Sequence, residues 1–323
     1  LNLYELEPDF IKLFSLDGQS SKEIIYADQH IEDLYKFGDV VRLYNNQDGG
    51  WASFVPTQNL VDMFEMKNGL MPEEEGSGYD ERHPFADRDP RLYNTVVYPG
   101  MDWEGKSGNR IINTLDKEIN GKKNADYYDA ATNASATGLI YAKYALPSIN
   151  QYSPSLKNDR LCPILFRYAE VLLTIAECNV ELNENLSEAL DLIDQLRQRG
   201  GHIKVDRSKY NTQDKIRELV RRERTIELAG EGLRRQDILR WKDKNGKMVA
   251  ETVMNGPLYH MVGTIDYSEP DPTRRAVITP ASELQEKDRL IENRKFEPYM
   301  RYWPIPQAQL EKNPKLVQNP GYN

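Results

Sequence analysis

The chain has 323 residues, of which 39% are hydrophobic and 29% are charged, and its mean hydropathy is −0.71. This composition supplies enough apolar material for a large core in one or two globular domains. Charged or polar residues interrupt every apolar run well before the roughly 20 residues that span a bilayer. The net charge of −9 disfavours nucleic acid as a partner, because most of the surface repels phosphates.

The first part of the chain contains few periodic segments. Apolar residues near helical spacing predict a helix over residues 1–16, and residues 23–26 fit either a short strand or a further helical turn. The dense turn cluster at residues 45–50 predicts a loop. A short helix is then expected from Pro56 through Phe64.

Residues 72–155 are rich in Gly, Pro, Asn and Tyr, which predicts long loops that carry short strands or helices. Within this segment, residues 92–97 are the best strand candidate, and residues 98–100 are the best turn candidate.

The clearest periodicity follows this loop-rich part. An apolar stripe predicts a helix over residues 165–183, and a second stripe predicts a helix over residues 186–199. Asn185 is expected to cap the second helix, with Glu188 three residues later, and Gly200-Gly201 ends it. These two helices form an antiparallel hairpin of the size of a tetratricopeptide unit.

Two more helices are predicted, over residues 214–229 and 233–241. Between Arg217 and Arg240, arginines alternate with acidic residues at helical spacings, which predicts ion-paired helices and not a nucleic-acid interface. After this the chain loosens, and the two prolines in residues 302–306 exclude a helix there. This tail is expected to be an extended strap across the helices, with Trp303 as its buried anchor.

These elements predict a mainly α fold of tetratricopeptide-like hairpins with long irregular loops and an extended C-terminal strap. The whole chain, 1–323, is interpreted as a single region with three parts. Residues 1–160 form the loop-rich part that carries the candidate ligand platform, 161–243 form the helices, and 244–323 form the C-terminal loops and the strap.

A set of short motifs in fixed order resembles the SusD/RagB family of outer-membrane nutrient-binding lipoproteins. Each motif is weak alone, but the ordered set, from about Pro56 to Tyr322, is highly specific. The motifs are Pro56-Thr57-Gln58 with Leu60-Val61-Asp62 and Phe64; Arg88-Asp89-Pro90-Arg91-Leu92; Arg167-Tyr168-Ala169-Glu170-Val171-Leu172-Leu173 with Ala176-Glu177; Leu196-Arg197-Gln198-Arg199-Gly200; Arg222-Glu223-Arg224 with Glu227-Leu228; Gly232, Arg234 and Asp237-Ile238 to Trp241; and Trp303-Pro304-Ile305-Pro306 with Gln318 to Tyr322.

The resemblance implies a lipid-anchored protein at the cell surface, on the outer membrane. There it would cap a SusC-type TonB-dependent transporter and deliver oligosaccharides, or peptides in some members. Family members are longer and begin with a signal peptide, a lipid-bearing Cys and further helical repeats. The chain is therefore expected to be a C-terminal portion, and its membrane contact would run only through an anchor that these residues lack.

No motif for catalysis or metal binding stands out. The four histidines are scattered, and none lies at metal spacing from a second His or Cys. Asp87 with Asp89, or residues 73–75, could supply a glycosidase's carboxylate pair, but a turn former and a solvated loop explain them better. Asn45, Asn46 and Asp48 fail the calcium pattern of an EF-hand. We expect no enzyme activity, no cofactor and no resident metal.

Sugar binding needs flat aromatic faces ringed by hydrogen-bonding groups. Trp51 and Trp103 lie in polar, glycine-bearing loops, where no apolar stripe explains a large ring, and exposed faces are expected for both. Packing of each loop onto the core explains any one of the candidates equally well. The candidate ligand-binding residues are Trp51, Trp103, Tyr44, Tyr79, Tyr98, Asn46, Asp48 and Arg110.

Three other functions remain open. A peptide-binding member of the same family would use the same architecture. A tetratricopeptide-like scaffold for a partner protein fits the helices but leaves the aromatic loops unexplained. A carbohydrate-active enzyme fits the loops but lacks an assignable acid and base.

The two cysteines, Cys162 and Cys178, form no CxxC motif and lie just before and within an apolar helical pattern. Both are expected to be buried free thiols.

Overall fold

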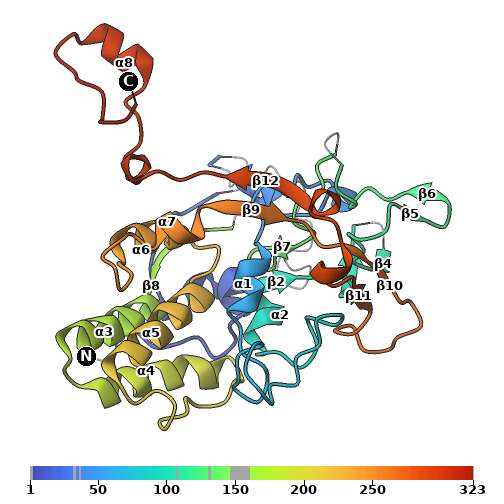
Figure 1. The fold of residues 1–323 in the computed structure, drawn as a ribbon, viewed down its shortest axis with the longest axis horizontal. Helices are drawn as coiled ribbons and strands as arrows, with labels where there is room; N and C mark the ends of the chain where they lie inside the picture. The colour runs from blue at the N-terminus through green and yellow to red at the C-terminus, as the bar shows by residue number, and fades with distance from the viewer. Residues whose placement is uncertain are drawn as a thin grey trace.

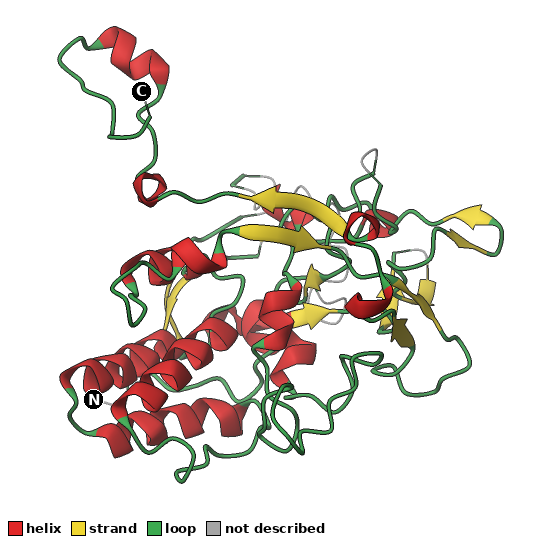
Figure 2. Ribbon diagram, viewed as in Figure 1, coloured by secondary structure: helices red, strands yellow, loops and turns green. Residues whose placement is uncertain are grey.

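The computed structural model is mainly helical, with its long helices gathered at one end and most of its short strands in the middle and at the other end (Figures 1 and 2). A C-terminal arm extends away from the body (Figure 1). The structure describes residues 3–31, 34–35, 38–106, 108–129, 132–145 and 161–322.

Three long helices form the centre of the helical end: α3 (Tyr168–Leu182), α4 (Leu186–Arg199) and α5 (Gln213–Glu227). Apolar residues from all three share one buried cluster, so the predicted helical hairpin is confirmed. The first helix begins three residues later than expected because Leu165 lies in a strand and is 55% exposed. Asn185 has left-handed backbone angles and makes no side-chain cap, so the predicted capping bond is wrong.

The remaining helices are short. The α-helices are α1 (Gln58–Asp62), α2 (Arg91–Thr95), α6 (Arg234–Arg240), α7 (Ala250–Val253) and α8 (Gln307–Lys312). The 3-10 helices are η1 (Lys12–Phe14), η2 (Asp17–Ser20), η3 (Gly38–Arg42), η4 (Asn46–Asp48), η5 (Ala281–Glu283), η6 (Glu286–Asp288) and η7 (Pro298–Arg301). The predicted short helix after Pro56 and the predicted fourth helix are confirmed as α1 and α6.

The strands of the described segments pair in antiparallel twos. The pairs are β1 (Ile24–Ala27) with β8 (Ile164–Arg167), β2 (Val96–Val97) with β7 (Ile140–Tyr141), β3 (Asp102–Gly105) with β4 (Gly108–Ile111), β5 (Glu118–Ile119) with β6 (Lys122–Lys123), β9 (Gly256–Tyr259) with β12 (Leu290–Arg294), and β10 (Gly263–Ile265) with β11 (Ala276–Ile278). Of the two alternatives for residues 23–26, the strand is correct.

Two local predictions in the loop-rich part are wrong. The helix expected over residues 1–16 is only the 3-10 turn η1 in the described residues, although Phe10 and Phe14 are buried as its stripe suggested. Residues 92–97 are mostly the helix α2, because the carboxylate of Asp89 accepts the backbone N–H of Arg91 and begins a helical turn. The turn at residues 98–100 is confirmed, with Gly100 at a φ of 99°.

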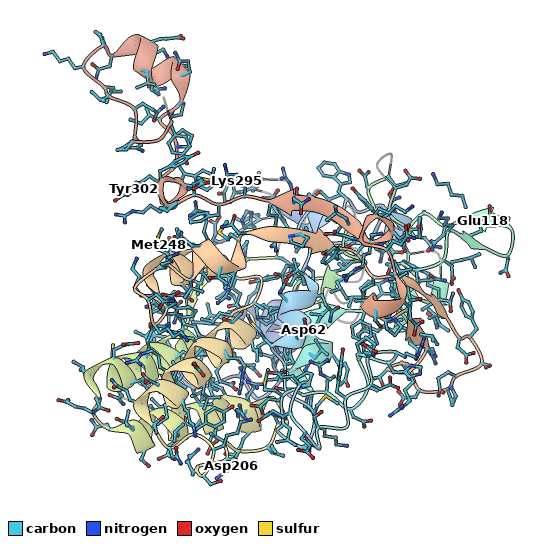
Figure 3. The ribbon with its side chains drawn as sticks, viewed as in Figure 1. Asp62, Glu118, Asp206, Met248, Lys295 and Tyr302 are labelled. Carbon is cyan, nitrogen blue, oxygen red and sulfur yellow. The ribbon has the colours of Figure 1, made fainter. Side chains whose placement is uncertain are left out.

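The C-terminal tail is only partly extended: residues 303–306 lack helix as predicted, but the tail also contains the helices η7 and α8, and it does not lie across the long helices. After β12 the chain leaves the body, and Trp303 is 73% exposed, so its expected role as a buried anchor is wrong (Figure 3). Its ring lies against the guanidinium of Arg235 on α6, 4.6 Å from the ring centroid. Hydrogen bonds also form within the tail; for example, the Asn319 side chain donates to the carbonyl of Trp303 at 2.7 Å.

Both cysteines are free, as expected. Cys162 is buried, and its thiol lies 3.1 Å from the side-chain oxygen of Gln19. Cys178 is exposed, so its expected burial is wrong: it lies on the outer face of α3.

Acidic residues of α5 are buried in a cluster of ion pairs. Glu223 accepts hydrogen bonds from Arg91 at 2.7 Å and from Arg197 at 2.8 Å. Arg197 also binds both oxygens of Glu65 at 2.9 Å. The α5 cluster consists of Glu65, Asp89, Glu223, Arg91, Arg197 and Arg222, with His202 against Glu65.

A second cluster surrounds Arg167, where β8 meets α3. The Arg167 guanidinium donates to Glu23 at 2.6 Å, to Glu227 at 2.7 Å and to Glu231 at 2.7 Å. The Arg167 cluster consists of Glu23, Glu227, Glu231, Lys143, Arg167 and Arg199. Each cluster holds as many carboxylates as Arg and Lys side chains, so the buried formal charge cancels within each.

Four glutamates in these clusters, Glu65, Glu223, Glu227 and Glu231, have lowered pKa values, which favours their ionised form. Burial alone would raise the pKa of Glu65, but the hydrogen bond from His202 and the charge of Arg197 outweigh it and lower the pKa to about 2. Glu227 behaves in the same way: burial opposes ionisation, yet Arg199 and Arg167 lower its pKa to about 2. The predicted ion pairing of the arginines between Arg217 and Arg240 is confirmed for most of them, although many of their acidic partners lie on other elements. It is wrong for Arg234 and Arg235, which form no ion pair with a described residue.

A close backbone approach lets Arg91 reach the α5 cluster. The side chain of Arg91 passes over Gly200 at the end of α4, where an added Cβ would lie 2.4 Å from the Cγ of Arg91. The glycine that ends the predicted helix therefore also leaves space for an ion pair.

Glu223→Gln should destabilise the protein by about 3–5 kcal/mol at pH 7, because it leaves two buried guanidiniums without their shared carboxylate. Urea denaturation measures this change. Glu218→Gln, at an exposed position on the same helix, is the matched control and should change stability by less than about 0.5 kcal/mol. Equal effects of the two substitutions would contradict a structural role for the cluster.

Candidate functional site

A cavity of about 760 Å³ opens among the short strands, away from the long helices. Its walls come from the β3–β4 hairpin, from β5 and from the loop between β10 and β11, which lie together in Figure 1. We call it the hairpin cavity. Its lining residues are Gln47, Asp102, Trp103, Glu104, Asn109, Arg110, Ile111, Ile119 and Tyr267.

Asp48 holds the inner wall of the hairpin cavity in place. Its fully buried carboxylate accepts the indole N–H of Trp103 at 2.7 Å and two N–H groups of Arg110 at 2.9 and 2.7 Å. The backbone N–H of Lys106 binds the same carboxylate at 2.8 Å. Gly105 is required here, because an added Cβ would lie 1.7 Å from Nη1 of Arg110.

The turn that carries Asp48 is itself fixed. Asn45 caps η4 by accepting the backbone N–H of Asp48 at 2.9 Å, and Gly49 ends it with a φ of 86°. The Asn46 side chain donates to the carbonyl of Ala125 at 2.8 Å. Burial alone would raise the pKa of Asp48, but the hydrogen bond and charge of Arg110 outweigh burial and lower it.

The outer wall is tied to the same hairpin. Arg275 donates to Asp102 at 2.6 Å and to the carbonyl of Gly100 at 3.1 Å, which anchors the β10–β11 loop. The side chain of Asn113 donates to the hydroxyl of Tyr267 at 2.8 Å. The cavity is therefore preformed by contacts between segments far apart in the sequence.

The structure brings together several of the predicted site residues. Trp103 and Arg110 are paired across the β3–β4 hairpin, and both line the cavity. Asp48 lies behind them, and Tyr44 is fully buried in the same core cluster as Trp103. Asn46 lies on the same short helix as Asp48, η4. The expected exposed face of Trp103 is wrong: the residue is 4% exposed, because its indole N–H is turned inward to Asp48.

The other three candidates lie outside the hairpin cavity. Tyr98 is buried against Phe85, with ring centroids 4.8 Å apart, so it offers no face to a ligand. Tyr79 is half-buried and lies against the guanidinium of Arg88, 5.5 Å from the ring centroid. Trp51 is 38% exposed, as expected of a platform, but it does not line the cavity.

Sequence reasoning missed the most accessible ring of the cavity, Tyr267, which is 54% exposed. It also missed Gln47, Asn109 and Ile119. The turn cluster at residues 45–50 marked the position of Gln47, but no signal in the sequence pairs the Tyr267 loop with the β3–β4 hairpin.

The aspartates considered for catalysis or metal binding have structural partners. Asp89 is fully buried against Arg91, and Asp87 binds Arg274 at 2.8 Å. Both oxygens of Asp48 already accept N–H groups, which argues against a calcium ion there. Among the described residues, no group of three or more His, Cys, Asp or Glu side chains is arranged to hold a metal. No helix in these segments is long and apolar enough to cross a membrane.

The carboxyl group of Asp126, behind the cavity wall, is buried in surroundings that disfavour its ionised form. Burial raises the pKa of Asp126 to about 6, helped by the nearby charge of Asp48 and opposed by the backbone N–H of Gln47 and by Arg110. One of its oxygens, Oδ2, accepts no hydrogen bond in the described structure. Because the folded-state pKa lies above the ordinary value of 3.8, stability falls as the pH rises from about 3.8 to 6 and stays reduced above pH 6.

Asp126→Asn should therefore stabilise the protein by about 1–3 kcal/mol at pH 8. The gain should shrink as the pH falls below 6 and vanish below about pH 3.8, where the wild-type carboxyl is protonated in both the folded and the unfolded state. Thermal melts at several pH values test this, with Asp129→Asn as the control, because the partly exposed Asp129 carboxylate pairs with Lys123 at the surface. Destabilisation of the same size at every pH would contradict the assignment.

Comparison with known proteins identifies the fold. The sequence model of the SusD family matches residues 13–322. SusD-like protein P2 of Formosa agariphila is 33% identical over 165 residues, which cover 46% of this chain and 32% of that protein. SusD-like protein P38 of the same organism is 32% identical over 139 residues, covering 39% of this chain and 26% of that protein.

Solved structures agree with this match. A SusD-like carbohydrate binding protein from Bacteroides fragilis superposes with a TM-score of 0.75 at 28% identity, covering 98% of this chain and 58% of that one. A second SusD-like protein from Bacteroides fragilis shares the fold, with a TM-score of 0.70 at 23% identity over 99% of this chain and 59% of that one. The chain thus spans less than two thirds of these relatives. With the family model matching nearly its whole length, the chain belongs to the SusD family.

Proposed function

We propose that this protein binds an oligosaccharide in the hairpin cavity at the cell surface and delivers it to a SusC-type TonB-dependent transporter of the outer membrane. The observation that carries the proposal is the exposed ring of Tyr267 in a preformed cavity lined by polar side chains. The structural relative described as carbohydrate binding supports the ligand class.

The chemistry of the hairpin cavity fits a sugar ring. A pyranose presents an apolar C–H face, which stacks on an aromatic ring, and hydroxyl groups at its edge. Tyr267, Ile111 and Ile119 supply apolar surface, whereas Gln47, Asn109 and Glu104 supply donors and acceptors. The volume is also within the range of about 300–1,000 Å³ typical of small-molecule sites.

Binding without turnover is the more consistent function. A glycosidase needs a carboxylic acid that is protonated near neutral pH, beside a second carboxylate. The carboxyl group near the hairpin cavity with a pKa of about 6, Asp126, lies behind its wall and does not line it. Asp102, which does line it, is occupied by Arg275.

Tyr267→Ala should weaken glycan binding several-fold, because one stacked ring contributes about 0.5–1.5 kcal/mol beyond area burial. A glycan array identifies the ligand, and calorimetry then measures dissociation constants, which we expect between roughly 10 μM and 1 mM for the wild type. Trp51→Ala tests the second exposed ring in the same way.

Tyr302→Ala is the matched control, since Tyr302 is similarly exposed but lies on the C-terminal arm. A reducing-sugar assay in parallel separates the other functions. Release of sugar would indicate an enzyme, and the absence of any glycan binding would favour a peptide-binding or scaffold function.

Delivery to a transporter predicts a stable complex at the outer membrane. The protein, attached there by a lipid anchor, should co-purify from detergent-solubilised outer membranes with a TonB-dependent barrel. Affinity purification followed by mass spectrometry tests this. Recovery of the protein solely from the soluble cytosol would contradict the proposed location and partner.

A further inference from the structure

A second cavity, of about 470 Å³, lies at the helical end of the molecule. Its walls come from α1, from the end of α5, from α6 and α7, and from Arg294 on β12. Asp62, labelled in Figure 3, marks the α1 side. We call it the α1–α6 cavity, and it shares no lining residue with the hairpin cavity.

Much of the lining is apolar and deformable. Three methionines, Met63, Met71 and Met254, face the α1–α6 cavity, together with aliphatic side chains such as Leu60 and Ile238. Methionine is unbranched and polarisable, so such a surface adapts to apolar groups of different shape. A ligand for this site needs an apolar body.

A guanidinium in the same cavity has no carboxylate partner. Arg234 donates to the hydroxyl of Thr225 at 2.7 Å and lies 5.7 Å from the centroid of the Trp241 ring. No carboxylate of the described residues lies within 4.0 Å of it, whereas Arg224 and Arg240 on either side of it in sequence bind Asp237. Burial lowers the pKa of Arg234, opposed by the charge of Asp237, so its charge is only partly compensated.

The other ionisable groups of the cavity leave Arg234 available. Arg294 reaches only a backbone carbonyl, that of Gly256, at 3.5 Å. Glu73 is exposed, and Asp62 accepts a hydrogen bond from Gln58 at 2.8 Å and also lines a neighbouring cavity. Burial raises the pKa of Asp62, opposed by the hydrogen bond from Gln58 and the charge of Arg88.

We propose that the α1–α6 cavity binds a carboxylate attached to an apolar body. The carboxylate accepts hydrogen bonds from Arg234, and the apolar body lies against the three methionines. A free fatty acid and the C-terminus of a peptide with an apolar last residue share this chemistry. The proposal is independent of glycan binding, because the two cavities have separate linings.

Calorimetry with octanoate tests the site directly, with octan-1-ol as the uncharged probe of the same length. Octanoate should bind at least about tenfold more tightly than octan-1-ol, since a hydrogen bond to a charged group exceeds one to a neutral group. Across butyrate, hexanoate and octanoate, affinity should rise about fourfold per methylene. N-acetyl-L-leucine represents the peptide C-terminus, and the tighter of the two carboxylates identifies the source.

Arg234→Gln should weaken octanoate binding at least about tenfold, because the amide retains a donor but loses the charge. Arg235→Gln is the matched control: the neighbouring arginine binds the carbonyl of Met300 outside the cavity, and its loss should leave octanoate affinity unchanged. Val253→Phe should also weaken binding by filling the apolar part while Arg234 remains.

Equal affinity for octanoate and octan-1-ol would overturn the proposal, as would wild-type octanoate binding by Arg234→Gln. A failure of both carboxylates to bind at about 10 mM would also overturn it, since binding that weak falls short of the −4.1 kcal/mol of a millimolar site. If Arg234→Gln does not fold, Val253→Phe and the comparison of the two wild-type probes decide the question. None of these outcomes depends on a glycan ligand.

Discussion

The fold depends on the burial of acidic side chains along one helix, α5. A buried carboxylate is tolerated only when cations reach it with good geometry. The arginines that bind Glu223 and Glu227 come from α2, α4 and β8. Loops that carry Glu65 and Glu23 must then approach the same helix to complete the charge balance. Pairing of charges therefore fixes the position of the loop-rich part against the helices. Apolar packing alone does not specify this position.

The same constraint explains why the short motifs are distinctive. Asp89 and Arg91, Arg167, Arg197 with Arg199, and Arg222 with Glu223 come from separate motifs, yet they meet in two clusters. None of these residues lines the hairpin cavity. The motifs that identify the family therefore describe its scaffold, and the proposed ligand site, the hairpin cavity, is built from residues that the motifs do not contain.

Sequence periodicity predicted the helices well because their stability comes from apolar stripes that local spacing displays. It failed where contacts outside the local spacing decide the structure: residues 92–95 belong to the helix α2 because Asp89 begins a turn, and Leu165 belongs to a strand because β1 pairs with β8. The site was predicted in part. Trp103 and Arg110 stood out as a ring and a charge in a polar loop, but sequence alone does not reveal that Asp48 would bury both groups or that Tyr267 would form the opposite wall.

The pairing of β1 with β8 has a consequence for how the chain folds. Ile24 pairs with Arg167 between the two strands, although most of the first half of the sequence separates them. Glu23, next to Ile24, also binds the Arg167 side chain. During synthesis, residues 24–27 therefore cannot pair with β8 until more than a hundred further residues have been made. Closing so long a loop is slow, whereas the α3–α4 hairpin requires only neighbouring residues. We therefore expect the helical hairpin to form first and the earlier-made, loop-rich part to pack onto it afterwards, opposite to the order of translation.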